Sequence, residues 1–238
     1  MAGGRGRYTW LAEEPLNPTL AQIGAGAAVV SALLLLIGQI FLVSAGKVPG
    51  ETADMFKQMS SGDLDRLAYG AALGSGSGVG MLFLWPVLYR ILRPGAPTWA
   101  LLGLILASTG SALTIMGWGA SQWVVPLGRA ARAGMDPLAL KGIADSLAAI
   151  SGGIVQGSYV VLGAGLAALS VAILVTRLFP RAIGWFAVAL AIILVMQAII
   201  PQAGNLFVYV GVVWLFWLAL IFNRAAVPAR TGSLKRKD

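Results

Sequence analysis

Stretches without a single charged residue constrain the fold of this chain more than any other feature. They cover residues 15–46, 67–89, 94–128, 146–176 and 182–223. A helix needs about 20 residues to cross a hydrocarbon core of ~30 Å, so each stretch is long enough to span a membrane. Because backbone polar groups in lipid must be satisfied within the chain, each stretch is predicted to be helical.

The last stretch is long enough for two spans. Pro201-Gln202-Ala203-Gly204-Asn205 lies at its middle, and the proline and the Gly-Asn pair are typical of a tight turn. We therefore predict an all-α fold, a bundle of six transmembrane helices between an N-terminal segment at residues 1–18 and a basic tail at residues 224–238. The predicted spans are about 19–45, 68–92, 98–123, 150–176, 182–200 and 205–223.

Composition supports a polytopic membrane protein and excludes other classes. Hydrophobic residues make up 58% of the chain and charged residues 11%, whereas soluble domains are about half apolar and about a quarter charged. These values exclude an ordinary soluble enzyme, a disordered chain and a nucleic-acid module. The expected partners are the lipid bilayer and either other membrane proteins or a second copy of the chain, with no nucleic acid.

The distribution of charge predicts the orientation in the cell membrane. Six spans place both termini on one side, which carries eleven basic and three acidic residues, whereas the other side carries six of each. The whole formal net charge of +8 therefore lies on one side. By the positive-inside rule, that side and both termini are expected to be cytoplasmic.

The chain has no cysteine and no histidine. Haem or chlorophyll ligated through histidine is thereby excluded, as is a Ser–His catalytic pair. No acidic residue lies inside a predicted span, and the one basic residue, Arg90, lies at the end of the second span, which argues against a proton-coupled transporter, a pump or a voltage sensor. The sequence therefore predicts no catalytic residue, no cofactor and no metal site.

The loops suggest an internal repeat. Residues 90–99 and 177–185 each place arginine at a helix end, then a proline, then a tryptophan that opens the next helix. Three tandem helical hairpins would produce this pattern. The preference of arginine, proline and tryptophan for membrane interfaces would produce it equally well.

Small and amide residues mark a candidate packing face or cavity. Gly70, Gly74 and Gly78 recur every four residues in the second span, a spacing that lets helices approach closely in lipid. A broken helix beside a binding site is the sharper interpretation. Gln156 and Gln197 are the deepest amides, suited either to interhelical hydrogen bonds or to a site for an uncharged substrate.

Two further groups are candidates for function. Asp63 and Asp145 each precede a predicted span, where helix N-capping explains them; a pair of external carboxylates that hold a cation is the alternative. Trp214, Phe216 and Trp217 form an aromatic patch on the last span, facing lipid or a partner.

Residues 177–185 and 214–218 carry a resemblance to a known family. The run Pro180-Arg181-Ala182-Ile183-Gly184 is similar to a Pro-Arg-x-hydrophobic-Gly turn between the fourth and fifth helices of a bacterial family of six-helix integral membrane proteins. An acidic residue in the last helix of that family is absent here. The resemblance implies the six-helix fold and no activity, because the family has no known function.

Three functions remain open. A non-enzymatic scaffold or accessory subunit of a membrane assembly is the first, since no chemistry is visible and packing faces are rich in glycine. A carrier or channel for a small neutral or apolar molecule is the alternative, and it predicts a cavity lined by residues 74–80, Gln156 and Gln197. A lipid-acting enzyme that uses the external carboxylates is the third.

Overall fold

The computed structural model describes residues 18–45, 61–200 and 204–226. Within these ranges the chain is helical, and six helices are long and apolar enough to cross a membrane, which confirms the all-α, six-span fold. They are α2 (Pro18–Ser44), α4 (Ser61–Leu92), α5 (Pro97–Ala120), α7 (Pro137–Thr176), α8 (Arg181–Ile199) and α9 (Gly204–Ala226). Most of the predicted terminal segments, residues 46–60 and most of the turn after Ile200 lie outside the described residues.

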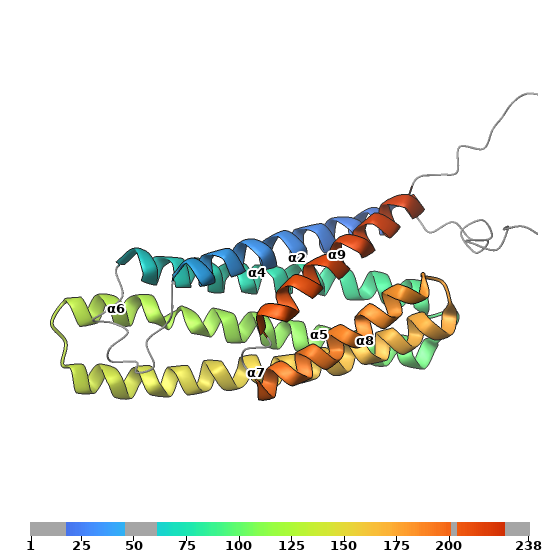
Figure 1. Ribbon diagram of the computed structural model, residues 1–238. Coiled ribbons are helices and arrows are strands. Elements are labelled where there is room, and N and C mark those ends of the chain that lie inside the picture. The colour runs from blue at the N-terminus through green and yellow to red at the C-terminus, as the bar shows by residue number, and fades with distance from the viewer. Residues whose placement is uncertain (1–17, 46–60, 201–203, 227–238) are drawn as a thin grey trace, which may run out of the picture.

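The six helices form a closed ring (Figure 1). In chain order each helix packs on the next, and α9 packs on α2 to complete the circle. The first and last described residues, Pro18 and Ala226, lie at the same end of the ring, which we call the terminal end. The opposite end, where α7 begins, is the α6 end.

The hairpin arrangement holds for four of the six helices. α2 packs extensively on α4, and α5 packs extensively on α7, so each pair is an antiparallel hairpin. α8 and α9 are also joined by a short connection, but α8 packs mainly on α7 and α9 mainly on α2. The third pair is therefore not a close hairpin, because α8 and α9 each pack more on another helix than on each other.

Three helices are longer than the spans predicted for them, and the second of the six begins at Ser61 instead of residue 68. The third continues beyond Ala120 through a 3-10 turn, η1 (Ser121–Trp123), into α6 (Val124–Arg132). Pro126 accounts for this irregular turn, because a proline has no N–H to donate and its ring clashes with the carbonyl four residues earlier. α7 begins at Pro137 and is continuous, so residues 137–149, which lie before the predicted span, form the first part of this helix.

The lengths of the helices differ in a way that matters for the site. α7 has 40 residues and α8 has 19, which correspond to about 60 Å and about 29 Å at 1.5 Å per residue. Both meet at the terminal end, so the α8–α9 hairpin ends halfway along α7 (Figure 1). The other four helices continue toward the α6 end.

Large side chains fill the ring at the terminal end. The main core is built on fully buried residues such as Trp85, Leu88, Leu169, Trp214 and Phe222. A second, smaller group closes the α6 end and consists of Ala45, Leu64, Val124 and Ala144, which we call the outer cluster. The space between the main core and the outer cluster is only partly filled.

Candidate binding cavity

A cavity of about 630 Å³ lies inside the ring, and all six membrane-spanning helices contribute to its wall. The largest apolar side chains of the wall are Leu35, Leu42, Met81, Leu162, Phe207 and Val208. Six side chains with polar atoms complete it: Gln39, Ser77, Thr114, Trp118, Tyr159 and Gln197. Among the described lining residues none is acidic or basic, so the wall is polar at a few points and uncharged.

The cavity extends up to the α4 backbone because α4 presents small residues to it. Gly70, Gly74 and Ser77 line the cavity on successive turns of one helix face. The same glycines allow close contacts, since a Cβ on Gly70 would lie 2.6 Å from Cγ of Leu42 and one on Gly74 would lie 3.2 Å from the Trp118 ring. Gly70 and Gly74 therefore have two effects: they let neighbouring helices approach closely, and they leave space for the cavity.

Gly78 and the shape of α4 distinguish the two interpretations of the glycine repeat, a helix-packing face and a broken helix beside a site. Gly78 does not line the cavity and packs on α5, where an added Cβ would lie 2.8 Å from Cγ1 of Ile115. α4 is a continuous α-helix from Ser61 to Leu92, even at Pro86. A cavity is present, but a broken helix is not its cause.

The polar groups of the wall come from different helices. The Tyr159 hydroxyl of α7 faces the side chains of Gln197 on α8 and Trp118 on α5. The amide oxygen of Gln197 is buried without a hydrogen-bond partner in the described part of the chain. Thr114 donates to the Gly110 carbonyl at 2.9 Å, and its hydroxyl lies 3.1 Å from that of Ser158. These groups can position the polar end of an uncharged ligand.

Gln156 does not belong to the cavity. Its side chain is exposed on the outside of α7, and the residues of α7 that line the cavity are Tyr159 and Leu162. Val155 contacts α5, and Tyr159 lies four residues later on the same inner face of α7. Because successive residues of a helix are rotated by about 100°, Gln156 lies off this face. Of the two glutamines expected there, the structure places only Gln197 at the cavity.

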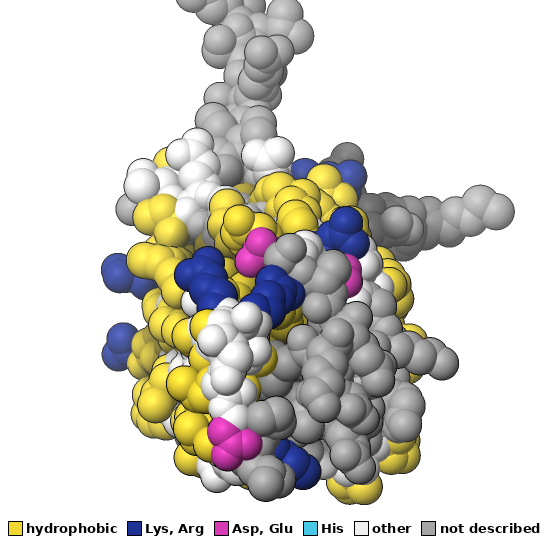
Figure 2. Space-filling model, turned by 90° about the vertical axis from the view of Figure 1, so that its left-hand side faces the viewer, with side chains coloured by type: hydrophobic (Ala, Val, Ile, Leu, Met, Phe, Trp, Pro, Cys, Tyr) yellow, Lys and Arg dark blue, Asp and Glu magenta, His cyan; other side chains and the backbone are white. Residues whose placement is uncertain are grey.

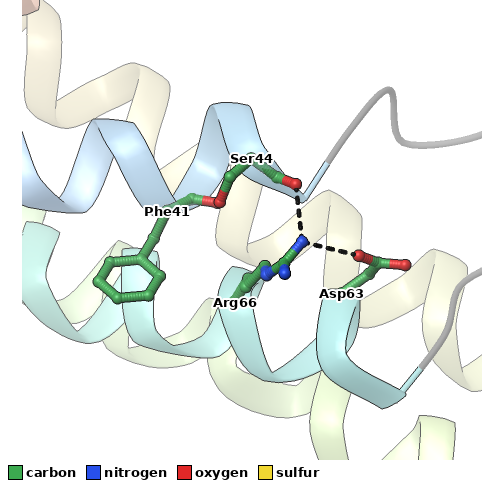
Figure 3. A network of polar contacts seen from close by, with 4 residues as sticks. All are labelled: Phe41, Ser44, Asp63 and Arg66. Atoms are coloured by element: carbon green, nitrogen blue, oxygen red, sulfur yellow. Dashed lines mark hydrogen bonds and ion pairs between the residues drawn. The ribbon is translucent and has the colours of Figure 1, made fainter.

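Asp63 lies in the first turn of α4 and forms an ion pair with Arg66 at 3.5 Å. The same guanidinium donates to the Ser44 carbonyl, the last of α2, at 3.2 Å (Figure 3). A cation at the C-terminus of a helix interacts favourably with its unpaired carbonyls. Arg66 therefore joins the end of α2 to the start of α4.

Asp145 has a different environment from the one expected. It lies inside α7, eight residues after its start, so it is not an N-cap, and it pairs with Lys141 at 2.8 Å. Acidic and basic side chains lie close together at the α6 end of the bundle (Figure 2). Within the described ranges, no three His, Cys, Asp or Glu residues are grouped so that they could hold a metal ion.

The aromatic patch expected on the last span divides into two parts. Trp214 is 2% exposed, donates its indole N–H to the Ile183 carbonyl at 3.3 Å and lies beside Trp85, so it is a core residue and not a surface residue. A polar N–H paired with a carbonyl lets this large ring be buried. Phe216 and Trp217 are half-buried, and the Trp217 and Phe186 rings pack edge-to-face with their centroids 5.6 Å apart.

The glycines of α5 that pack on α7 were not identified from the sequence. On α5, Gly103, Gly110 and Gly117 face α7, and a Cβ on Gly110 would lie 2.6 Å from the backbone nitrogen of Leu162. These glycines recur every seven residues, which is the signal that would have found them. The fourth span also has glycines at 153, 157, 163 and 165, where close packing is expected: Gly153 and Gly157 meet nothing within 4 Å, whereas Gly163 packs on α8 and a Cβ on Gly165 would lie 2.8 Å from Cα of Ala107 on α5.

A closed ring of six apolar helices around an uncharged cavity defines a multi-pass α-helical membrane protein. Residues 26–222 match the family model described as Domain of unknown function (DUF4386), and the chain belongs to this family. Every cavity-lining residue lies within the matched range. Comparison with curated proteins and with solved structures finds no match. The expectation of a family without a known function is confirmed.

Proposed function

We propose that this protein is a carrier that binds one small, uncharged and largely apolar molecule in the central cavity. The observation that carries the proposal is the cavity itself, about 630 Å³ in volume and lined by all six membrane-spanning helices. Ligand sites commonly have volumes of about 300–1,000 Å³, with mainly apolar walls and a few polar groups. A bundle filled with side chains at this level would instead have favoured a scaffold.

The chemistry of the wall supports a neutral ligand. A charged ligand in an apolar interior needs a paired charge, and the described wall offers amide, hydroxyl, indole and phenol groups only. The same wall provides no carboxylate for coupling to protons. The proposal is therefore a carrier that works down a gradient of its ligand.

The other functions are supported less directly. An accessory-subunit role remains a prediction, for which Phe216 and Trp217 are the candidate contact residues. A lipid-acting enzyme would need paired acid and base groups, but Asp63 and Asp145 are each engaged by a neighbouring basic residue. The cell membrane, with both termini in the cytoplasm, is the location we propose from the charge distribution.

Two matched variants of α9 test the carrier. Val208 lines the cavity, whereas Val213 lies on the same helix and is 53% exposed on the outside. Native mass spectrometry of the protein extracted from its own membrane should find a bound neutral molecule in the wild type. Val208→Phe should reduce its occupancy strongly, because the ring occupies ligand space, and Val213→Phe should retain it. Equal occupancy in both variants, or no bound molecule in the wild type, would contradict the proposal.

A further inference from the structure

The cavity opens on one side of the ring, beside the α8–α9 hairpin. α9 lies near α2 at the terminal end and leans away from it toward Gly204 (Figure 1). Gln197, Phe207 and Val208, which lie close to the tip of this hairpin, form one side of the cavity. Gly38, Gln39, Leu42 and Val43 of α2 also line it.

Val43 marks the mouth of the cavity. It lines the cavity and is nevertheless 61% exposed, so this part of the wall is also part of the outer surface. On α2, Ile40 lies three residues before Val43 and is exposed and apolar, whereas the carbonyl of Ser44, the residue after Val43, accepts from Arg66. The sequence stretches that contain Val43 and the α8–α9 hairpin, residues 15–46 and 182–223, hold no charged residue. The rim is therefore apolar along α2, which suits lipid, and it is bordered by the Arg66–Asp63 pair at the end of that helix.

Three polar groups of the wall meet at one place. Trp118, Tyr159 and Gln197 come together from α5, α7 and α8, and the amide oxygen of Gln197 is buried without a partner in the described part of the chain. A buried acceptor without a donor costs free energy, which a ligand hydroxyl or amide N–H would recover after a small rotation of the side chain. The cavity therefore combines a mainly apolar wall, which includes Val43, with one uncharged polar cluster.

From this arrangement we infer that the ligand is a lipophile dissolved in the bilayer, with one uncharged hydrogen-bonding group, and that it reaches the cavity sideways from the membrane between α2 and the α8–α9 hairpin. The inference rests on the proposed ligand-binding function and adds the ligand class and its route. The polar group binds at Tyr159 and Gln197, and the hydrocarbon chain extends toward Val43. A water-soluble ligand would instead need a polar opening at one end of the ring.

Photolabelling of the full-length protein in liposomes tests the route. The probe is a long-chain fatty alcohol that carries a diazirine next to its hydroxyl group, and the labelled residues are mapped by mass spectrometry. Labelling is expected around Trp118, Tyr159 and Gln197. A short, water-soluble alcohol with the same diazirine should label these residues much less.

Two variants of α2 provide the control. Val43 and Ile40 are 61% and 59% exposed, so tryptophan at either position is compatible with folding, but only Val43 lines the cavity. Val43→Trp should reduce interior labelling about tenfold, because the large ring occupies the mouth. Ile40→Trp should leave it unchanged.

The outcomes separate this inference from the proposed function. A molecule bound in native mass spectra, together with interior labelling that Val43→Trp does not reduce, would overturn the lateral route and leave the carrier standing. Faster interior labelling by the short alcohol would overturn the lipophile class. Absence of both a bound molecule and interior labelling would overturn the carrier and this inference together.

Discussion

Gly110 and Gly157 lie on the two halves of one hairpin, and they show that a glycine matters through what an added Cβ would meet. At Gly110 the nearest atoms are the backbone nitrogen and Cα of Leu162, at 2.6 and 2.7 Å, and backbone atoms move only with the whole helix. At Gly157 nothing lies within 4 Å. Both positions are glycine in the sequence, and only the position of the neighbouring helix distinguishes them.

Gly110→Ala is expected to destabilise the protein, because α5 and α7 must separate to accommodate the methyl group. The expected loss is about 1–3 kcal/mol, the usual cost of overpacking a filled interface. Gly157→Ala should change stability by less than about 0.5 kcal/mol, or raise it slightly through helix propensity. Thermal unfolding in detergent measures both, and equal melting temperatures would contradict the interface described here.

Arg66 provides a second prediction at this scale. Arg66→Ala removes a hydrogen bond to the Ser44 carbonyl and an ion pair with Asp63, and thereby loosens the α2–α4 connection. Both groups are partly exposed, so the expected loss is below about 1 kcal/mol. Lys141→Ala, which breaks only the pair within α7, should cost less. A larger loss for Lys141→Ala in thermal unfolding would exclude a bridging role for Arg66.

At the scale of elements, neighbouring helices are joined by a few buried polar contacts. The Trp85 indole on α4 donates to the Ser111 hydroxyl on α5 at 2.8 Å, and both residues are buried. On the opposite side, the Trp214 indole of α9 donates to the Ile183 carbonyl of α8. In lipid these bonds fix the register of helices whose surfaces are otherwise uniformly apolar.

Ser111→Ala should cost about 1–3 kcal/mol, because it leaves the Trp85 N–H buried without an acceptor. Trp85→Phe removes the donor, so the double variant should lose less than the sum of the two single variants. A double-mutant cycle on thermal unfolding in detergent measures the coupling. Additive effects would show that this hydrogen bond contributes nothing to the α4–α5 interface.

The pattern of elements was largely predictable from the sequence. Charge-free stretches located all six helices, since a charged side chain in lipid is costly and its position limits each span. The starts of α4 and α7 were placed too late, at residues 68 and 150 instead of 61 and 137, because the N-terminal parts of both helices carry charged residues and extend past the apolar stretch. Hydropathy detects the apolar part of a helix and not the helix itself.

At the scale of the whole molecule, both ends of the described chain lie at the terminal end, where the described ranges carry five arginines (residues 90, 93, 177, 181 and 224) and no acidic residue. The absence of native cysteine makes the orientation directly measurable. Met135→Cys, in the exposed turn between α6 and α7, should react in intact cells with a charged, membrane-impermeant thiosulfonate. Arg93→Cys, between α4 and α5, should react only after the cells are permeabilised. The reverse pattern would invert the proposed topology.

The sequence by itself determined the helical class and the number of spans, because these depend on local composition and on the cost of charge in lipid. It also grouped Gly70, Gly74, Gly78, Gln156 and Gln197 as one candidate site, of which Gly70, Gly74 and Gln197 line the cavity. Only the tertiary structure decided that Gln156 faces outward, that Trp214 is buried and that Asp145 lies within a helix. The cavity, too, is a tertiary property: it exists because the α8–α9 hairpin ends halfway along α7, between two cores that sequence spacing does not reveal.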